Sequence, residues 1–281
     1  MPLSINFNGT LLPQNEVFLT AENRAFRYGD GIFETLKVIN GKILFLDLHF
    51  ERLRTGVERL KIQMHKNFSA SFFEKEIQKV TLFSGNFRVR FTIFRADGGF
   101  YEPTNNEGKF VIEAFAVSDT YYPNYEKGLK VAISNEIYVQ NSYFSGIKSV
   151  NSLPYVMASI QKKGLKVDDL LLKNAAGNIA EATHSNIFFI KNNKIVTPPV
   201  SEGCIDGVMR KIVLEISKEL NFDIAVAPVP TADIYQYDEI ILTNVIQGIR
   251  WVEYLDKKVF QKNKTSQFID KINNIVTLKI N

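Results

Sequence analysis

The feature that most constrains the fold is a hairpin signal near the N-terminus. Residues Ile32 to Ile39 and Lys42 to Phe45 flank the dipeptide Asn40-Gly41. Asn-Gly suits the two positive-φ positions of a tight turn, so we expect two antiparallel strands here. A further strand is expected at Arg88 to Phe94, where polar and apolar residues alternate strictly. The first part of the chain is therefore predicted to contain a sheet.

Two helices are predicted between these strands. The first covers about Asp47 to Ile62, where Phe50, Leu53, Val57 and Leu60 share one face. The second covers Ser71 to Phe83. Another strand is expected at Lys109 to Val117. Helical spacing places Arg52 off the apolar stripe of the first helix, so its side chain is free to reach elsewhere.

The best candidate for a domain boundary is the stretch Ser118 to Gly128, which has turn formers, a proline and no periodicity. Beyond it, Ser152 is a candidate helix cap, with Pro154 in the first turn and Gly164 closing the helix. The remaining expected elements are strands at Leu129 to Ser134, Leu170 to Lys173, Asn186 to Ile190, Lys194 to Thr197 and Ile240 to Leu242, and helices at Met209 to Leu220 and Ser266 to Leu278.

Composition excludes several classes of protein. The formal charge is only +4 over 281 residues, with no clustered basic face, so nucleic acid is not an expected partner. The single cysteine, Cys204, rules out an internal disulfide and suits a reducing compartment. No segment resembles a signal peptide or a membrane span, and the three histidines share no metal-ligand spacing. We expect a cytoplasmic protein without a metal.

Three segments carry residues suited to chemistry. The segment Gly146 to Pro154 places Lys148 just before a helix, among small or polar neighbours. The segment Gly177 to Phe189 places Glu181 at the edge of apolar strands, where a carboxylate is solvated, paired or functional. In Gly203 to Arg210 a glycine-bearing turn enters a helix, whose free N–H groups suit an anion. Each segment alone also fits an ordinary loop or helix start.

Taken together, these segments resemble the class IV aminotransferase family, which includes the branched-chain and D-amino-acid aminotransferases and the aminodeoxychorismate lyases. The resemblance spans about Asn6 to Val252. The matching blocks, in chain order, are Gly29-Asp30-Gly31-Ile32-Phe33-Glu34-Thr35, His49-x-x-Arg52-Leu53, Lys148-x-x-Asn151, Glu181-x-Thr183-x-x-Asn186-Ile187-Phe188, Ile195-x-Thr197 and Ile205-x-Gly207-Val208-x-Arg210.

The resemblance implies an α+β, two-domain fold of type IV, like that of the D-amino-acid aminotransferases. The small N-terminal α/β domain is expected at 1–118, an interdomain linker at 119–127, and a larger pseudo-barrel domain at 128–281 that carries the cofactor lysine. The cofactor would lie between the domains. A homodimer is the expectation for this family.

The resemblance also implies the cofactor, pyridoxal 5′-phosphate, and the residues that bind it. Lys148 would form a Schiff base with the cofactor aldehyde and later act as acid and base. Glu181 would keep the pyridine nitrogen protonated. The remaining cofactor contacts implied by the resemblance are Arg52, Asn186, Val208, Met209, Thr243 and Asn244.

The expected substrate site departs from every subfamily. The loop Arg95 to Tyr101 lacks the Arg-x-His pair of the D-amino-acid enzymes, and Phe33 replaces their tyrosine. Ser152 stands where branched-chain enzymes often carry a tyrosine. We expect Arg95, or one of Arg88 and Arg90 if that face of the strand points into the cleft, to hold the substrate carboxylate, with Phe33 as a further substrate contact.

Three functions remain open on the sequence. The first is an aminotransferase that moves an amino group between an amino acid, preferably a branched-chain-like L-amino acid, and a 2-oxo acid. The second is a lyase that converts 4-amino-4-deoxychorismate to pyruvate and p-aminobenzoate. The third is a non-catalytic binding protein with the same fold. Retention of Lys148, Glu181 and Arg52 together favours an enzyme over the third function.

Overall fold

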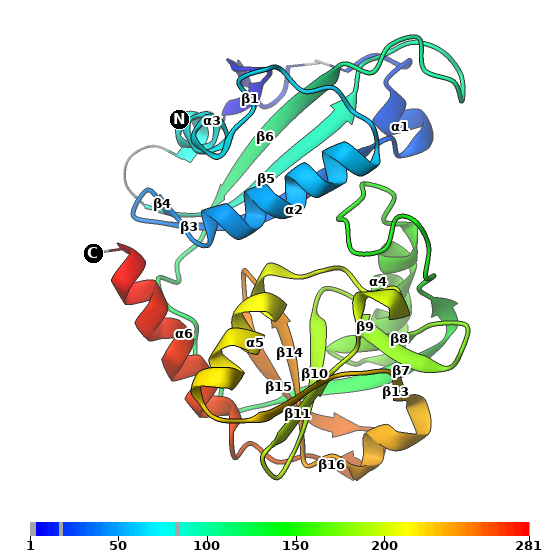
Figure 1. The fold of residues 1–281 in the computed structure, drawn as a ribbon, viewed down its shortest axis with the longest axis vertical. Helices are drawn as coiled ribbons and strands as arrows, with labels where there is room; N and C mark the ends of the chain where they lie inside the picture. Colours follow the sequence, from blue (N-terminus) through cyan, green and yellow to red (C-terminus); the bar gives the residue numbers. More distant parts are fainter. Residues whose placement is uncertain (1–3, 17–18, 82–84, 281) are drawn as a thin grey trace. The chain divides into compact units, whose positions relative to one another are not determined.

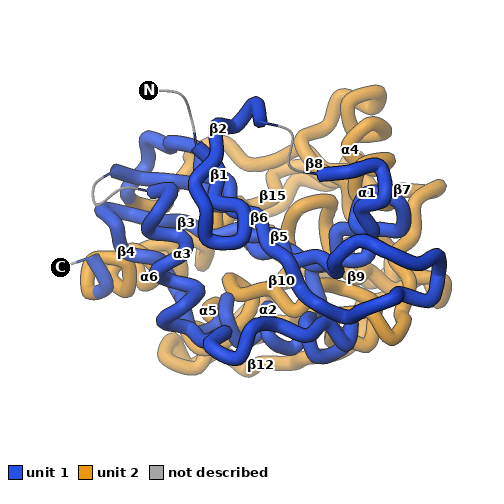
Figure 2. Tube along the Cα trace, turned by 90° about the horizontal axis from the view of Figure 1, so that it is seen from above, with its two compact units in different colours: residues 1–120, 147–151, 279–281 blue, residues 121–146, 152–278 orange. Residues whose placement is uncertain are grey.

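The structure is a computed structural model that describes residues 4–16, 19–81 and 85–280. The chain divides into two compact units (Figure 2). The first unit comprises residues 1–120, 147–151 and 279–281, and the second comprises residues 121–146 and 152–278. Each unit has its own sheet and its own apolar core.

The first unit is built on a six-stranded antiparallel sheet with the strand order β2-β1-β6-β5-β3-β4. The predicted hairpin is confirmed as β3 (Gly31–Ile39) and β4 (Lys42–Ile43), although β4 is shorter than expected because a helix begins at Leu46. The other elements of this unit are β1 (Ser4–Phe7), β2 (Thr10–Pro13), α1 (Arg24–Tyr28), α2 (Leu46–Arg59), α3 (Ala70–Thr81), β5 (Asn86–Arg95) and β6 (Gly108–Ala116).

Apolar side chains from the sheet and two helices form the core of the first unit. Helix α2 packs on β3, and α3 packs on β1, β5 and β6 (Figure 1). The predicted alternation of β5 is confirmed, since Val89, Phe91 and Ile93 are fully buried while Arg88 is exposed. These side chains meet Leu53 of α2 and Phe73 of α3. Burial of such side chains provides most of the driving force for folding.

Helix α2 approaches β3 closely at a single glycine. A Cβ atom added at Gly56 would lie 2.8 Å from Cδ1 of Ile32 and 3.3 Å from its Cγ2. Gly56 is buried on the same face of α2 as Leu53 and Val57. The absence of a side chain at this position therefore allows the helix to lie against the strand.

The second unit is built on a mixed, curled sheet with the order β12-β11-β10-β14-β15-β7-β8-β9-β13, and β16 pairs with β15. Its strands are β7 (Leu129–Tyr138), β8 (Asp169–Lys173), β9 (Asn178–Ala182), β10 (Asn186–Lys191), β11 (Lys194–Thr197), β12 (Asp223–Val226), β13 (Val229–Pro230), β14 (Glu239–Asn244), β15 (Gly248–Leu255) and β16 (Lys258–Val259). The central strands β10 and β14 are almost entirely buried, which agrees with their continuous apolar sequences.

Three α-helices accompany this sheet. Helix α4 (Leu153–Leu165) packs on β7 and β8, α5 (Val208–Glu219) packs on β12 and β14, and α6 (Thr265–Ile280) ends the chain. The prediction that Gly164 closes α4 is wrong. The helix continues to Leu165 and ends at Lys166 in the left-handed conformation. Gly164 is tolerated because it is exposed and nothing approaches its Cβ position.

The units differ from the predicted division. Residues 147–151, which include Lys148, and residues 279–281 group with the first unit, although they were expected within the domain 128–281, and the expected linker 119–127 is divided between the units. The segment 147–151 is the one that carries a candidate site residue. Backbone hydrogen bonds explain its grouping with the first unit. Phe33 donates its N–H to the carbonyl of Lys148 at 2.8 Å, and Val150 donates to Gly31 at 3.0 Å. Within the described ranges, no helix is long and apolar enough to cross a membrane.

The close approach of α2 and β3 can be tested by adding a side chain. We expect Gly56→Val to lower the free energy of unfolding by about 1–3 kcal/mol, because the added atoms overpack the contact with Ile32. Gly164→Val places the same side chain in an exposed helix and is expected to change stability by less than about 0.5 kcal/mol. Urea unfolding followed by circular dichroism measures both, and equal stability of the two variants would contradict the close-packing argument.

Candidate active site

Lys148 lies beside an aromatic ring of the first unit. Its Nζ is 4.6 Å from the centroid of the Phe33 ring, a distance that allows a cation–π contact. Phe33 is buried in β3, and its own N–H bonds the Lys148 carbonyl. The backbone pairing therefore holds the lysine segment along the start of β3, and the ring gives the amine an apolar neighbour.

Arg90 contacts the same ring. Its guanidinium carbon lies 3.6 Å from the Phe33 centroid, and the residue projects from β5, which pairs with β3. The side chain is half-buried, and within the described parts of the chain no group accepts a hydrogen bond from it. A countercharge comes from Glu113, its cross-strand partner on β6. Arg90 is thus a cation near Lys148 whose donors are available to an anion.

Arg52 belongs to a buried charge cluster that the sequence did not indicate. Its Nε and Nη2 donate to the two carboxylate oxygens of Glu34, at 2.8 and 2.6 Å. The Nδ1 of His49 lies 2.7 Å from Oε2 of the same carboxylate. As helical spacing predicted, Arg52 lies off the apolar stripe of α2, and its guanidinium reaches Glu34 on β3. His49, Arg52 and Gly56 form part of the buried face of α2, because Glu34 supplies a partner for both charged side chains.

The cluster fixes the charge of each member. Burial alone would raise the pKa of Glu34, but the charge of Arg52 and the hydrogen bonds from Arg52 and His49 outweigh it and lower the pKa to about 2. Burial lowers the pKa of His49, and the charges of Arg52 and Lys148 act in the same direction. A neutral His49 donates its Nδ1–H to the carboxylate. Its Nε2 is then an acceptor, and this buried atom has no partner within the described residues.

The second unit buries Glu181 against two donors. Glu181 lies in β9 and is 2% exposed. Its Oε1 accepts a hydrogen bond from the hydroxyl of Tyr155 at 2.6 Å, and its Oε2 accepts one from the N–H of Ile205 at 3.1 Å. Tyr155 was not predicted, because nothing in the sequence distinguishes it from an ordinary core tyrosine at a helix start.

Helix α5 begins next to Ile205. Its N-cap is Gly207, which has no side chain to cap the helix, so the N–H groups of Val208 and Met209 in the first turn are free of such a contact. Asn186 donates its Nδ2 to the Ile205 carbonyl at 2.7 Å. A Cβ atom at Gly207 would lie 1.8 Å from the Asn186 Oδ1, so only glycine fits there. The predicted residues Asn186, Val208 and Met209 are thus brought together.

Thr243 lies beside the same group. It pairs with Asn186 between β14 and β10, and its buried Oγ1 has no hydrogen-bond partner among the described residues. Asn244 follows it and caps the next turn by accepting from Ile246 and Gln247, while its Nδ2 donates to Ser185. The Thr243 hydroxyl, the helix start and Asn186 together form a site in which an anion can accept hydrogen bonds.

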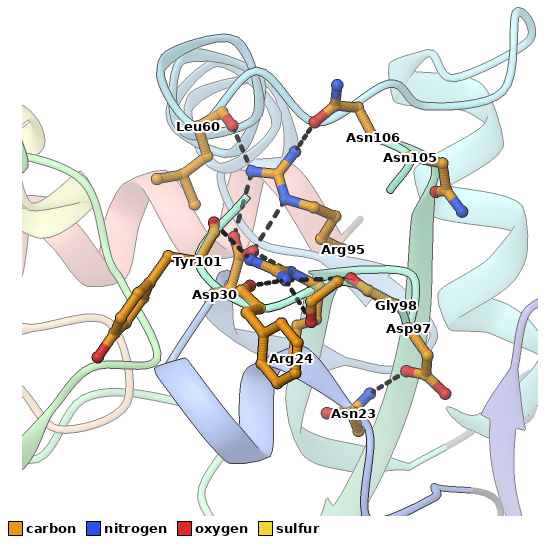
Figure 3. Close-up of polar contacts among 12 residues, drawn as sticks. Asn23, Arg24, Asp30, Leu60, Arg95, Asp97, Gly98, Tyr101, Asn105 and Asn106 are labelled. Atoms are coloured by element: carbon orange, nitrogen blue, oxygen red, sulfur yellow. Dashed lines mark hydrogen bonds and ion pairs between the residues drawn. The ribbon is translucent and has the colours of Figure 1, made fainter. Parts of the chain in front are cut away.

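Arg95 does not have the geometry expected of a substrate anchor (Figure 3). Its Nε and Nη2 donate to the carboxylate of Asp30, and Nη2 also donates to the Leu60 carbonyl. Its Nη1 donates to the Lys61 carbonyl and to Asn106. A guanidinium has five N–H groups, and these five contacts engage them all. The expectation that Arg95 holds the substrate carboxylate is therefore contradicted, because all its N–H groups already donate to residues of the same unit.

A second buried arginine, which the sequence did not reveal, shares Asp30. Arg24 lies on α1 and is 3% exposed, and its Nε donates to Asp30 at 2.8 Å. Its remaining nitrogens donate to the carbonyls of residues 98–101, so it closes the loop after β5 (Figure 3). Burial would raise the pKa of Asp30, but the hydrogen bonds and charges of Arg95 and Arg24 outweigh it and lower the pKa.

Comparison with known proteins shows the family to which the chain belongs. Residues 31–254 match the family Amino-transferase class IV. The chain is 28% identical over 240 residues to an aminodeoxychorismate lyase of Vibrio harveyi, covering 85% of this chain and 87% of that protein. It is 24% identical over 290 residues to branched-chain-amino-acid aminotransferase 6 of Arabidopsis thaliana, covering 96% and 80%.

Among solved structures, a branched-chain aminotransferase of the thermophilic archaeon Thermoproteus uzoniensis with norvaline is similar to this chain with a TM-score of 0.89 and 20% identity, covering 99% of this chain and 95% of that one. This likeness shows the fold of type IV. The chain belongs to the class IV aminotransferase family. Members of this family depend on pyridoxal 5′-phosphate, so the chain is a pyridoxal-phosphate-dependent enzyme.

The buried cluster around Glu34 predicts a pH-dependent stability. We expect Glu34→Gln to lower the free energy of unfolding by about 3 kcal/mol at pH 7, because it leaves Arg52 buried without its countercharge. The folded pKa lies below the ordinary value of 4.5, so the stabilisation by the ionised carboxylate is complete above pH 4.5 and is lost as the pH falls toward 2.

Urea unfolding at several pH values measures this effect. The stability difference between wild type and Glu34→Gln should narrow below pH 4.5, and a difference that stays constant down to pH 2 would contradict the assignment. The control is Glu58→Gln on the same helix, whose carboxylate is 67% exposed and pairs with Arg54 at 3.8 Å. That variant should differ from wild type by less than about 0.5 kcal/mol.

Proposed function

We propose that the chain is an aminotransferase that carries pyridoxal 5′-phosphate on Lys148 and moves an amino group between a branched-chain-like L-amino acid and a 2-oxo acid. The observation that carries this proposal is the set of complementary groups among the cofactor residues. These are an amine at Lys148, a buried carboxylate at Glu181, and a helix start without a side-chain cap beside the Thr243 hydroxyl, which no described residue bonds.

The groups of the second unit fit the two ends of the cofactor. A buried carboxylate can accept a hydrogen bond from a protonated pyridine nitrogen, and we assign this role to Glu181. The N–H groups of Val208 and Met209 and the Thr243 hydroxyl are donors that a phosphate would satisfy. Asn186 and Asn244 hold the strand ends and turns around them.

The order of residues along the chain supports the assignment of Lys148 to the same cofactor. Gly146 bridges Ile205, and its carbonyl accepts the N–H of Asp206 at 3.0 Å. Lys148 follows two residues later, so its Cα lies within about 7 Å of that of Gly146. Ile205 is also the residue whose N–H binds Glu181. This connectivity supports the assignment of Lys148 and Glu181 to the same cofactor.

The bound cofactor would supply an electron sink that accepts the electron pair left on the substrate carbon when that carbon loses its proton. In the proposed reaction Lys148 holds the cofactor and then carries that proton as base and acid through its Nζ. Its apolar neighbour Phe33 limits the access of water on that side. We assign Arg52 to the cofactor phosphate, with Glu34 and His49 setting the orientation of its guanidinium.

Arg90 is the proposed anchor of a substrate carboxylate, in place of Arg95. It shares the Phe33 ring with Lys148, so substrate bound to its guanidinium would lie near the reactive amine. Phe33 would then contact the substrate with its ring. A guanidinium is suited to this role because it can bind both oxygens of a carboxylate.

A lyase acting on 4-amino-4-deoxychorismate is the second candidate, and the similarity to the Vibrio harveyi lyase favours it. The two activities separate in one experiment. Holoenzyme is incubated with L-leucine, L-isoleucine, L-valine or D-alanine and 2-oxoglutarate, and in parallel with 4-amino-4-deoxychorismate. Formation of glutamate with the L-amino acids supports the aminotransferase. Formation of pyruvate and p-aminobenzoate from 4-amino-4-deoxychorismate, with no glutamate formed from the amino acids, supports the lyase. Homodimer formation and a cytoplasmic location stay predictions.

The role of Lys148 gives a spectroscopic prediction. Holoprotein should show the absorbance band of lysine-bound cofactor. Borohydride reduction should abolish this band and attach the cofactor permanently to the protein. Lys148→Ala should show neither the band nor the attachment, because the variant lacks the amine that forms the bond. Lys163→Ala, at an exposed position of α4, should behave as wild type. Mass spectrometry of peptides from the reduced protein identifies the lysine that carries the cofactor. Cofactor attached to the Lys148→Ala variant after reduction would contradict the assignment.

The three arginines of β5 should differ in the effects of their substitution. Arg90→Lys is expected to raise KM for the amino-acid substrate about ten-fold or more, because a lysine cannot bind a carboxylate with two parallel hydrogen bonds. Arg88→Lys, exposed on the same face of β5, should leave KM unchanged. Arg95→Lys should instead lower the unfolding temperature, because it breaks the contacts with Asp30. A KM effect at Arg95 with none at Arg90 would reverse the assignment.

A further inference from the structure

Tyr155 contacts the buried carboxylate of Glu181 from helix α4. It is the third residue of that helix, where Pro154 occupies the first turn and packing on β7 and β8 holds the backbone. Its carbonyl accepts the Ser159 hydroxyl at 2.8 Å, within the same helix. The phenol therefore reaches Glu181 from a rigid element that begins a few residues after Lys148 in the chain.

The carboxylate is held at both oxygens, by donors of different origin. The Tyr155 hydroxyl binds Oε1 at 2.6 Å, and the Ile205 N–H binds Oε2 at 3.1 Å. Two donors on separate elements set the plane of the carboxylate and restrict its rotation. A buried carboxylate also needs such donors, because burial favours its protonated form and hydrogen bonds favour the anion.

These two donors are uncharged. A lysine or arginine in place of Tyr155 would cancel the negative charge of Glu181, whereas a phenol stabilises the carboxylate and leaves its charge in place. Burial, the charge of Glu181 and the hydrogen bond to it all raise the pKa of Tyr155, so the phenol remains a donor throughout the working pH range. The contact of α4 with Glu181 thus preserves a negative charge at a buried position.

The titratable groups around Cys204 are neutral or paired. Burial, followed by the charge of Glu181, raises the pKa of Cys204 to about 12, so that thiol is neutral. Asp206 and Arg210 form an ion pair with each other at 3.5 Å, and Arg210 also donates to the Pro198 carbonyl.

We propose that Tyr155 is a positioning residue that orients Glu181 and keeps it ionised, so that the carboxylate can hold the protonated pyridine nitrogen of the cofactor. This inference rests on the proposed function of Glu181. It adds a residue of α4, outside the predicted cofactor contacts, that sets the strength of that interaction. The substitution Tyr155→Phe removes the hydroxyl and retains the ring, so it isolates the hydrogen bond.

The first measurement is cofactor affinity. Apoprotein is titrated with pyridoxal 5′-phosphate, and Tyr155→Phe is expected to bind about ten-fold more weakly than wild type, because it loses a hydrogen bond to a charged group. Tyr138→Phe is the control, since that exposed hydroxyl bonds the Asn135 carbonyl within β7. It should bind the cofactor as wild type does. Equal affinity of wild type and Tyr155→Phe would overturn the proposal.

The second measurement does not depend on activity or on bound cofactor. Infrared spectra of apoprotein over a pH range follow the C=O band of a protonated buried carboxyl group, and the Glu181→Gln spectrum identifies the band of Glu181. In Tyr155→Phe this band should appear at a higher pH than in wild type, because the anion has lost a donor. An unchanged midpoint contradicts a role of Tyr155 in keeping Glu181 ionised.

A second variant covers the case in which Tyr155→Phe does not fold. Incorporation of 3,5-difluorotyrosine at position 155 retains the ring and makes the hydroxyl a stronger donor, so the Glu181 band should move to lower pH. An unchanged band overturns the proposal. A failure of the proposed function gives a different result from a failure of this inference. If the proposed function fails, wild type shows no borohydride-sensitive cofactor band. If only this inference fails, that band is intact in wild type and in Tyr155→Phe.

Discussion

The pairing of residues 147–151 with β3 is the interaction on which the rest of the site depends. Two backbone hydrogen bonds, from Phe33 to Lys148 and from Val150 to Gly31, attach a loop of the later sequence to the first strand of the early hairpin. The amine of Lys148 then lies against the Phe33 ring, and Arg90 reaches the ring from the neighbouring strand. Backbone bonds of this kind do not depend on side-chain identity, so they hold the segment whatever its side chains contact.

Buried charged side chains have different kinds of partners in the two units. In the first unit, Glu34 neutralises Arg52 directly, and Asp30 binds Arg24 and Arg95, so that carboxylates and guanidinium groups compensate one another inside the fold. In the second unit, Glu181 accepts hydrogen bonds from a phenol and a backbone N–H, which are uncharged donors. The first arrangement pairs opposite charges, whereas the second supplies a buried carboxylate with hydrogen-bond donors, which agrees with the role proposed for Glu181.

The family blocks named candidate residues in the sequence, but they did not show which groups each one contacts. Arg95 has the residue type expected of a carboxylate anchor, yet Asp30, Asn106 and two carbonyls use all of its donors. Arg90, one of the alternatives, lies over Phe33 instead. Tyr155 and Arg24 carry no local pattern, because the partner of Tyr155 is 26 positions away and the carbonyl partners of Arg24 are 74 to 77 positions away along the chain.

The sequence by itself determined the local structure: the Asn40-Gly41 turn, the alternation of β5 and the apolar faces of α2 and α5 follow from short-range spacing. It also determined the family, because the motif blocks preserve both residue type and order. Only the tertiary structure decided which charged groups pair. Ion pairs and hydrogen bonds join residues that are distant in the chain, and their partners are set by the packing of strands and helices, which local periodicity does not encode.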